Sequence, residues 1–409
     1  MSTCPMSGVS RRGLLGGAAA GAAAAAATLG LDAARADVTP APAAYAFEGP
    51  HQAGILTPAQ RSAAYVALDV TAATRPQLAQ ALRTLTDDLR FLTAGGTPPD
   101  AGLVATNDDN GILGPQVPAD GLTVTVSVGA SLFDHRFGLG DRKPRQLRAM
   151  DVFDNDRPDP ARTGGDLLLQ ICADNQDTVL HALRQVLRHN RGAFAVRWRQ
   201  DGFVSPSRPD GAPRNLLGFK DGTANAEILD DQQLVDELVW VGADAGEPAW
   251  AVGGSYHVVR LIRMFVEFWD RVSIREQQRM IGRDRTTGAP LTMTHETDPV
   301  SYERDSTGDV IPFDAHIRLA NPRDGSADRS RMLRRGYSYD AGTDANGQLD
   351  EGLIFTTFNA DLDRQFVAVQ KRLTGEPLED YISPFGGGYF FALPGVQGQD
   401  DWLGRGLLA

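Results

Sequence analysis

The sequence predicts an α+β fold built from two ferredoxin-like units whose antiparallel sheets pack together. In the first half of the chain, strand-like and helical patterns follow one another in the order β-α-β-β-α-β. A similar order returns in the second half, as a likeness of pattern rather than of residues. The 409-residue chain is 42% hydrophobic and 22% charged, which indicates a packed protein long enough for two domains.

In the first unit, apolar residues alternate at strand spacing or recur at helical spacing. The predicted strands cover 63–70, 121–133, 166–174 and 192–203, and the predicted helices cover 75–92 and 177–190.

In the second unit, the predicted strands cover 255–270, 349–360 and 386–395, and the predicted helices cover 273–282 and 361–375. The second of these helices carries Phe366, Val369 and Leu373 on one face. A long stretch over 284–348 has no clear periodicity and interrupts the unit. Structureless stretches of that length in a compact domain are usually functional.

The first 36 residues differ in kind from the rest. A twin-arginine pattern at Ser10–Leu15 precedes a weakly apolar run, and Ala34-Arg35-Ala36 supplies a cleavage site. The run is too weakly apolar for a good spanning helix. We therefore expect a Tat export signal and a periplasmic, extracellular or cell-envelope location. The expected division is a signal over 1–36, a linker over 37–56, an N-terminal domain over 57–210 and a C-terminal, ligand-binding domain over 211–409.

Charge and cysteine content narrow the class of protein. The net charge of −12 argues against a nucleic-acid binder. Cys4 lies in the signal, so the mature chain keeps only Cys172 and has no internal disulfide. Cys172 lies in an apolar strand-like run, which predicts a buried small hydrophobe.

Two residues are candidates for a catalytic or ligand-binding role. Asp221, in RNLLGFKDGTAN (214–225), precedes a glycine, so it is either a turn residue or a carboxylate aimed at a ligand. His316 stands between apolar positions in the irregular stretch and is either a packed histidine or a metal ligand. The seven histidines form no metal-binding pattern with cysteines or carboxylates.

Several motifs in order resemble the dye-decolourising peroxidases, and more closely their exported deferrochelatase/peroxidase branch. The resemblance covers most of the mature chain. It is carried by VGASLFDHRFGL (128–139), RNLLGFKDGTAN (214–225), IGRDRTTGAPL (281–291), DAHIRLANPR (314–323), MLRRGYSY (332–339) and GGGYFFALPG (386–395).

The resemblance implies a DyP-type dimeric α+β barrel with one haem b in the C-terminal unit and His316 as the proximal iron ligand. A ligating imidazole needs an acceptor at its other nitrogen. Counting back from the YFF strand, Asp380 is expected in that role, with Glu379 as the alternative.

The same resemblance makes Asp221 the distal acid that shuttles a proton of hydrogen peroxide, best at acidic pH. Arg334 would stabilise the charge on the departing oxygen. The other residues expected around the haem are Gly222, Thr223, Ala224, Asn321, Pro322, Arg323, Leu353 and Phe355, with Arg323 or Arg334 pairing with a propionate. Gly336 stands where some relatives carry Asn, which would lower the efficiency of peroxide cleavage.

An organic reductant is the expected second substrate. Because bulky dyes cannot enter a small distal pocket, surface aromatic residues are candidate electron relays, although aromatics in strands are usually core. The candidates are Tyr337, Tyr339, Tyr389, Trp269 and Trp402.

Alternative functions use the same pocket. One is iron supply, by release of iron from haem with the porphyrin intact or by oxidation of ferrous iron beside iron-uptake transporter components. A haem carrier without turnover and a cofactor-free ferredoxin-like binding domain are two further readings. The Asp221–Arg334 pair argues against simple carriage. The resemblance also implies a homo-oligomer.

Overall fold

The computed structural model describes residues 44–409 except 101, 103 and 105. The expected export signal over 1–36 lies outside the described residues. Among the residues described, no helix is long and apolar enough to cross a membrane.

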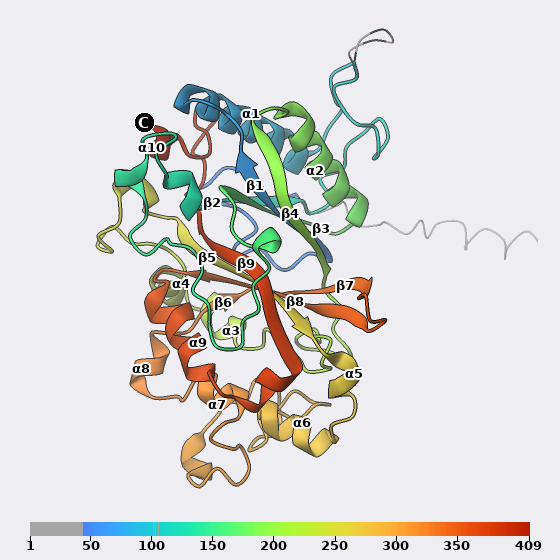
Figure 1. The fold of residues 1–409 in the computed structure, drawn as a ribbon, viewed down its shortest axis with the longest axis vertical. Coiled ribbons are helices and arrows are strands. Elements are labelled where there is room, and N and C mark those ends of the chain that lie inside the picture. The colour runs from blue at the N-terminus through green and yellow to red at the C-terminus, as the bar shows by residue number, and fades with distance from the viewer. Residues whose placement is uncertain (1–43, 101, 103, 105) are drawn as a thin grey trace, which may run out of the picture. The chain divides into compact units, whose positions relative to one another are not determined.

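The first unit has the predicted order of elements (Figure 1). Its strands pair in the order β2-β3-β1-β4, all antiparallel, as in a ferredoxin-like sheet. The elements are β1 (Ser62–Val70), α1 (Arg75–Ala94), β2 (Thr123–Gly129), β3 (Leu167–Ala173), α2 (Gln176–His189) and β4 (Phe194–Phe203).

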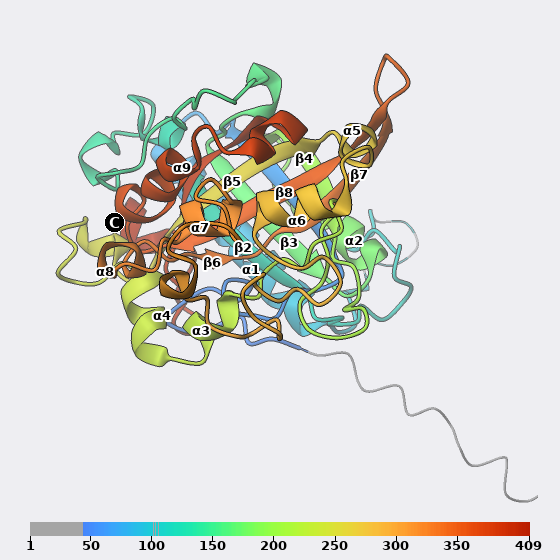
Figure 2. The ribbon, with the colours of Figure 1, turned by 90° about the horizontal axis from the view of Figure 1, so that it is seen from below.

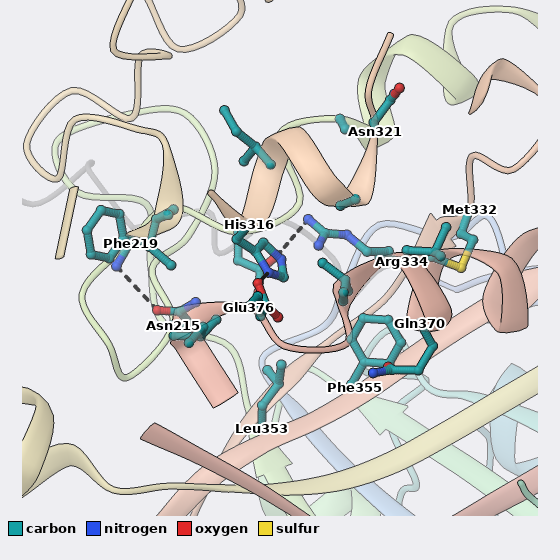
Figure 3. Close-up of a pocket in the computed structure, with 18 of the residues that line it drawn as sticks. Asn215, Phe219, His316, Asn321, Met332, Arg334, Leu353, Phe355, Gln370 and Glu376 are labelled. Atoms are coloured by element: carbon teal, nitrogen blue, oxygen red, sulfur yellow. Dashed lines mark hydrogen bonds and ion pairs between the residues drawn. The ribbon is translucent and has the colours of Figure 1, made fainter. Parts of the chain in front are cut away.

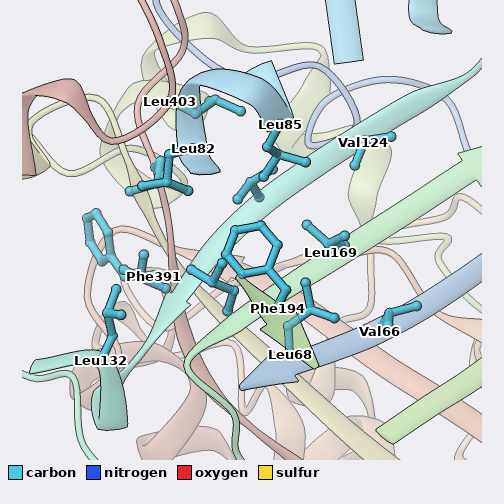
Figure 4. Close-up of a cluster of buried hydrophobic side chains, with 14 of the residues drawn as sticks. Val66, Leu68, Leu82, Leu85, Val124, Leu132, Leu169, Phe194, Phe391 and Leu403 are labelled. Carbon is cyan, nitrogen blue, oxygen red and sulfur yellow. The ribbon is translucent and has the colours of Figure 1, made fainter. Parts of the chain in front are cut away.

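Local chemistry sets the limits of α1. Thr74 caps the first turn and exchanges side-chain hydrogen bonds with Gln77. Gly95, whose φ is 71°, directly follows the last residue of the helix. The apolar stripe of α1 packs on one face of the sheet, where Leu82 and Leu85 meet Leu68 and Leu169 (Figure 4). This buried contact holds α1 against the sheet of the first unit.

The second unit repeats the arrangement with β9-β5-β8-β7. Between β5 and β8 it carries the short helices that surround the site. The elements are β5 (Ser255–Met264), α5 (Val266–Trp269), α6 (Ile274–Ile281), α7 (His316–Ala320), α8 (Gly325–Asp328), β6 (Leu333–Arg334), β7 (Tyr337–Thr343), β8 (Leu349–Asn359), a π-helical turn (Asp363–Val367), α9 (Ala368–Leu373) and β9 (Ile382–Ala392). The helices α3 (Asn225–Leu229) and α4 (Gln232–Leu238) precede the unit, and α10 (Arg405–Leu408) ends the chain.

The two sheets join into one closed, barrel-like antiparallel sheet. β9 pairs with β2 of the first unit, β4 meets β7 through Phe203 and Ser338, and β5 also pairs with β8. At Gly387 a Cβ atom would lie 2.0 Å from the Val259 carbonyl oxygen, so the close approach of β9 to β5 requires glycine. Cys172 is fully buried in the cluster between the two sheets, which confirms its predicted role.

Several segments differ from their predictions. The strand predicted over 255–270 ends at Met264, because the chain turns into α5 and buries Trp269. The stretch 284–348 is not structureless, since it contains α7, α8, β6 and β7. The described part of the predicted linker 37–56 packs on the folded protein. The His51 ring stacks 3.8 Å from Trp240, and Gln52 donates to the Val126 and Leu393 carbonyls.

Candidate active site

Helices α7 and α9 pack against each other beside the second sheet (Figure 2). A cavity lies between these helices and the sheet (Figure 3). Strands β5 and β8 form its apolar wall, and the segment before α3 forms another side. The predicted site residues on its wall are Asp221, Gly222, Thr223, Ala224, His316, Asn321, Arg323, Arg334, Leu353 and Phe355. Pro322 and Asp380 are not on this wall.

His316 is the first residue of α7 and faces the cavity (Figure 3). Its Nδ1 lies 2.7 Å from Oε2 of Glu376, whose side chain is only 4% exposed. Burial opposes the charged imidazole, but the neighbouring carboxylate of Glu376 outweighs it and raises the pKa of His316. With Nδ1 held, Nε2 is the nitrogen left for a ligand in the cavity.

The expectation that Asp380, or Glu379, holds the histidine was therefore wrong. Glu376 immediately precedes a 3-10 turn over Pro377–Tyr381, and β9 begins at Ile382, before the predicted strand. The turn leaves Asp380 exposed, whereas Glu376 is buried against α7. Glu379 reaches the cavity wall, but its carboxylate accepts the Gly375 backbone N–H.

Asp221 is both a turn residue and a cavity residue. Its backbone N–H donates to the Pro213 carbonyl, and Gly222 follows with a φ of 99°, which favours glycine. The carboxylate projects into the cavity, where Oδ1 lies 2.8 Å from Nη2 of Arg334. Both side chains are about one-third exposed, at 29% and 31%, so the pair is accessible to a small molecule.

Arg334 is fixed through its backbone. The Asn225 side chain accepts from the Arg334 N–H at 3.0 Å and donates to the Arg334 carbonyl at 2.5 Å. Asn225 begins α3, directly after the Asp221 turn, so the same short segment carries the acid and holds the backbone of its partner. Asn225 is the last residue of the RNLLGFKDGTAN motif, and nothing in the sequence around it predicts this role.

The rest of the cavity lining consists of apolar and cationic side chains. Leu353 on β8 pairs in register with Ile262 on β5, and Phe355 pairs with Arg260. Met264 on β5 also lines this wall. Cationic side chains line the cavity as well, namely Arg260, Arg283, Arg323 and Arg331. Arg323 lies 3.7 Å and Arg331 3.5 Å from the Glu227 carboxylate.

The five candidate relay aromatics are buried, so their prediction as surface residues was wrong. Tyr337 and Tyr339 lie inside the closed sheet at 1% exposure, since their strand turns that face inward. Tyr389, Trp269 and Trp402 are 3%, 1% and 7% exposed.

Fold and site together define a class of protein: a double ferredoxin-like barrel with a carboxylate-held histidine and an Asp–Arg pair on one apolar cavity. Comparison with known families agrees. The family model of the Dyp-type peroxidase N-terminal domain matches residues 52–204, and that of the C-terminal domain matches residues 212–397. The chain belongs to the Dyp-type peroxidase family.

Individual relatives agree with this assignment. The chain is 51% identical over 366 residues to a deferrochelatase of Yersinia pestis, covering 88% of this chain and 84% of the relative. It is 52% identical over 367 residues to the deferrochelatase of Escherichia coli K12, covering 88% and 86%. Among solved structures, a DyP-type peroxidase of Cellulomonas bogoriensis has a TM-score of 0.80 at 37% identity and covers 90% of this chain and 99% of its own. An oxyferrous complex of DtpA from Streptomyces lividans has a TM-score of 0.80 at 36% identity, with coverage of 90% and 98%.

Proposed function

We propose that this protein is a haem peroxidase that reduces hydrogen peroxide and oxidises an organic donor. The observation that carries the proposal is the presence, on one cavity, of the His316–Glu376 pair and the Asp221–Arg334 pair. The first pair suits an iron ligand, and the second suits proton transfer.

The residues present fit haem b. The donor set offers one imidazole whose Nδ1 is held, an apolar wall at Leu353 and Phe355, and arginines for two carboxylates. His316 would ligate the iron, and Arg323, with Arg283 or Arg331, would hold the propionates. When bound, haem supplies the iron at which peroxide is reduced and through which a donor is oxidised.

Two residues of the chain transfer the peroxide proton and stabilise the charge on the departing oxygen. A carboxylate oxygen of Asp221 accepts a proton from hydrogen peroxide and returns it to the departing oxygen, which leaves as water. The guanidinium of Arg334 stays charged and stabilises the negative charge that develops on that oxygen. Leu353 and Phe355 exclude bulk water from this side of the cavity, which strengthens both interactions.

Stopped-flow absorbance with hydrogen peroxide at about pH 4–5, where carboxylates titrate, tests this function. We expect a rapid shift of the Soret band in the wild-type haem-loaded protein and a shift at least about 100-fold slower in Asp221→Ala or Arg334→Leu. A wild-type Soret band that does not respond to peroxide would falsify the peroxidase proposal.

A second candidate function is release of iron from haem with the porphyrin left intact, or oxidation of ferrous iron beside an iron transporter. Relatives about half identical to this chain are named deferrochelatases, which favours it. Anaerobic incubation with chemically reduced, ferrous haem and a ferrous chelator tests the release of iron. Metal-free porphyrin fluorescence that rises together with chelated iron supports release, whereas an unchanged Soret band rejects it.

We further propose export by the Tat pathway to the periplasm, cell envelope or exterior, supported by the twin-arginine pattern and the Ala34–Ala36 site. Replacement of Arg11 and Arg12 by Lys should retain the protein in the cytoplasm in cell fractionation. Assembly into a homo-oligomer, supported by family resemblance, is checked by light scattering of the exported protein.

A further inference from the structure

One carboxylate outside the proposed catalytic pair contacts the loop that carries Asp221. Oε2 of Glu296 lies 2.6 Å from Nζ of Lys220, and Oε1 accepts from the Thr223 hydroxyl at 2.8 Å and from the Ala212 N–H at 3.0 Å. Lys220 directly precedes Asp221, and Thr223 follows it by two positions. Glu296 therefore holds the loop on both sides of the acid.

The contact is buried and shaped for this carboxylate. The side chains of Lys220 and Glu296 are only 3% and 11% exposed. Two glycines leave room for them: a Cβ at Gly211 would lie 2.0 Å from Oε2 of Glu296, and a Cβ at Gly288 would lie 2.7 Å from Cδ of Lys220. Both glycines have positive φ, at 70° and 78°. A side chain at either position would collide with the ion pair.

Glu296 also links the Asp221 loop to the segment that leads to His316. The Glu296 carbonyl accepts from Nη1 of Arg283 at 3.0 Å, and Arg283 itself lines the cavity. The chain then runs from Glu296 to α7, whose first residue is His316. Glu296 thus contacts the Asp221 loop through its side chain and a cavity-lining arginine through its backbone carbonyl.

We propose that Glu296 is a positioning residue that fixes the Asp221 carboxylate for proton transfer from peroxide. This inference rests on the proposed peroxidase function. Glu296 faces the backbone and side chains around Asp221 and acts through Lys220 and Thr223. It orients the acid and exchanges no proton with peroxide.

Replacing Glu296 by Gln keeps the shape but removes the closer and more buried of the two carboxylates at the Lys220 ammonium, leaving only Asp210 at 3.4 Å, whose side chain is 86% exposed. The lysine must then move toward Asp210 and water. That movement displaces the residue next to Asp221. A displacement of about 1 Å at a catalytic group can cost about 100-fold in rate. We therefore expect the second-order rate of Soret change with peroxide to fall 10- to 100-fold in Glu296→Gln, while haem affinity changes less than about 3-fold.

Hydrogen–deuterium exchange of the cofactor-free protein supplies a readout independent of turnover. Backbone amides over 212–225 should exchange faster in Glu296→Gln, while the strands of the first unit remain unchanged. Asp298→Asn is the matched control. Asp298 accepts from the His295 and Thr294 N–H groups in the same turn. That variant should leave both the exchange over 212–225 and the peroxide rate at wild-type values.

The outcomes separate this proposal from the peroxidase function. If the wild type does not react with peroxide, the proposed function fails, and the exchange data still decide whether Glu296 holds the loop. If the wild type reacts and Glu296→Gln reacts equally fast, the positioning role is wrong. Should Glu296→Gln fail to fold, the double variant Lys220→Met, Glu296→Gln removes both charges and is measured instead. A wild-type rate in the double variant overturns the proposal, and a slow rate supports it.

Discussion

The imidazole Nδ1 of His316 and the Glu376 carboxylate lie 2.7 Å apart, although 60 positions separate them in the chain. The negative charge makes the ring a stronger donor through its other nitrogen and fixes its orientation. In the haem-loaded protein, Glu376→Gln should therefore raise the midpoint reduction potential and weaken haem binding about 10-fold. Spectroelectrochemistry and a haem titration measure the two effects.

The matched control is Asp380→Asn, since Asp380 is exposed and close in sequence. We expect its potential and its haem affinity to equal those of the wild type. A shifted potential in Asp380→Asn together with an unchanged one in Glu376→Gln would show that Glu376 is not the partner in solution.

The two hydrogen bonds between the Asn225 side chain and the Arg334 backbone give a second prediction. Asn225→Ala removes both hydrogen bonds to the Arg334 backbone, each worth about 1 kcal/mol. We expect a loss of about 1–3 kcal/mol of unfolding free energy and a peroxide rate about 10-fold lower, because the guanidinium is less well placed. Asn225→Asp keeps an acceptor for the Arg334 N–H but sets a carboxylate oxygen against the Arg334 carbonyl, so this variant should also fall below the wild type in stability and rate. Equal peroxide rates in the wild type, Asn225→Ala and Asn225→Asp would show that these hydrogen bonds do not position Arg334.

The parts of the fold and site that the sequence predicts are those specified by residues close together in the chain. The strongly periodic segments, such as α1 and β1, were found close to their limits because local burial specifies them. β7 was missed because Tyr337, Ser338 and Tyr339 are all buried and do not alternate. The dipeptide Asn346-Gly347 in the turn before β8 was a usable hairpin signal.

The site, too, has residues that the sequence predicts and residues that it does not. Asp221, His316 and Arg334 lie in motifs, so resemblance located them, and the structure brings them to one cavity. Glu376 and Glu296 act across gaps of 60 and 76 positions, the latter to Lys220. No local spacing encodes such contacts, because the closed sheet and the turns between its elements create them.

Acid should destabilise the protein through His257. This ring is fully buried between the sheets, accepts or donates at Ser127 and stacks 4.4 Å from Phe358. Burial disfavours the imidazolium and lowers the pKa of His257 to about 3. The unfolded chain binds a proton near pH 6.5, whereas the folded one does not until about pH 3, so stability falls as the pH drops through this window.

Replacing His257 by Asn removes that contribution. The variant should lose less unfolding free energy than the wild type between pH 6.5 and 4, by up to about 1.4 kcal/mol for each pH unit. Urea unfolding at several pH values measures the difference. His135→Asn, at an exposed position, should follow the wild type. Parallel curves for wild type and His257→Asn would rule out a neutral buried imidazole.

The helix that presents His316 depends on Arg372 of α9. Nε of Arg372 donates to the Leu319 carbonyl at 3.1 Å, and Nη2 donates to the Ala320 carbonyl at 2.8 Å and to the Ser330 hydroxyl at 2.9 Å. These bonds satisfy carbonyls at the end of the five-residue helix α7, which is too short to be stable alone. Arg372→Met keeps the apolar stem but removes all three, and should cost about 1–3 kcal/mol of stability.

Because α7 then frays, haem affinity should fall several-fold, while molecules that have bound haem should react with peroxide near the wild-type rate. Lys371→Met is the control, since Lys371 is the exposed neighbour on the same helix. Haem titration followed by stopped-flow on the saturated protein separates the two effects. Unchanged affinity in Arg372→Met would mean that haem binding orders α7 without help from α9.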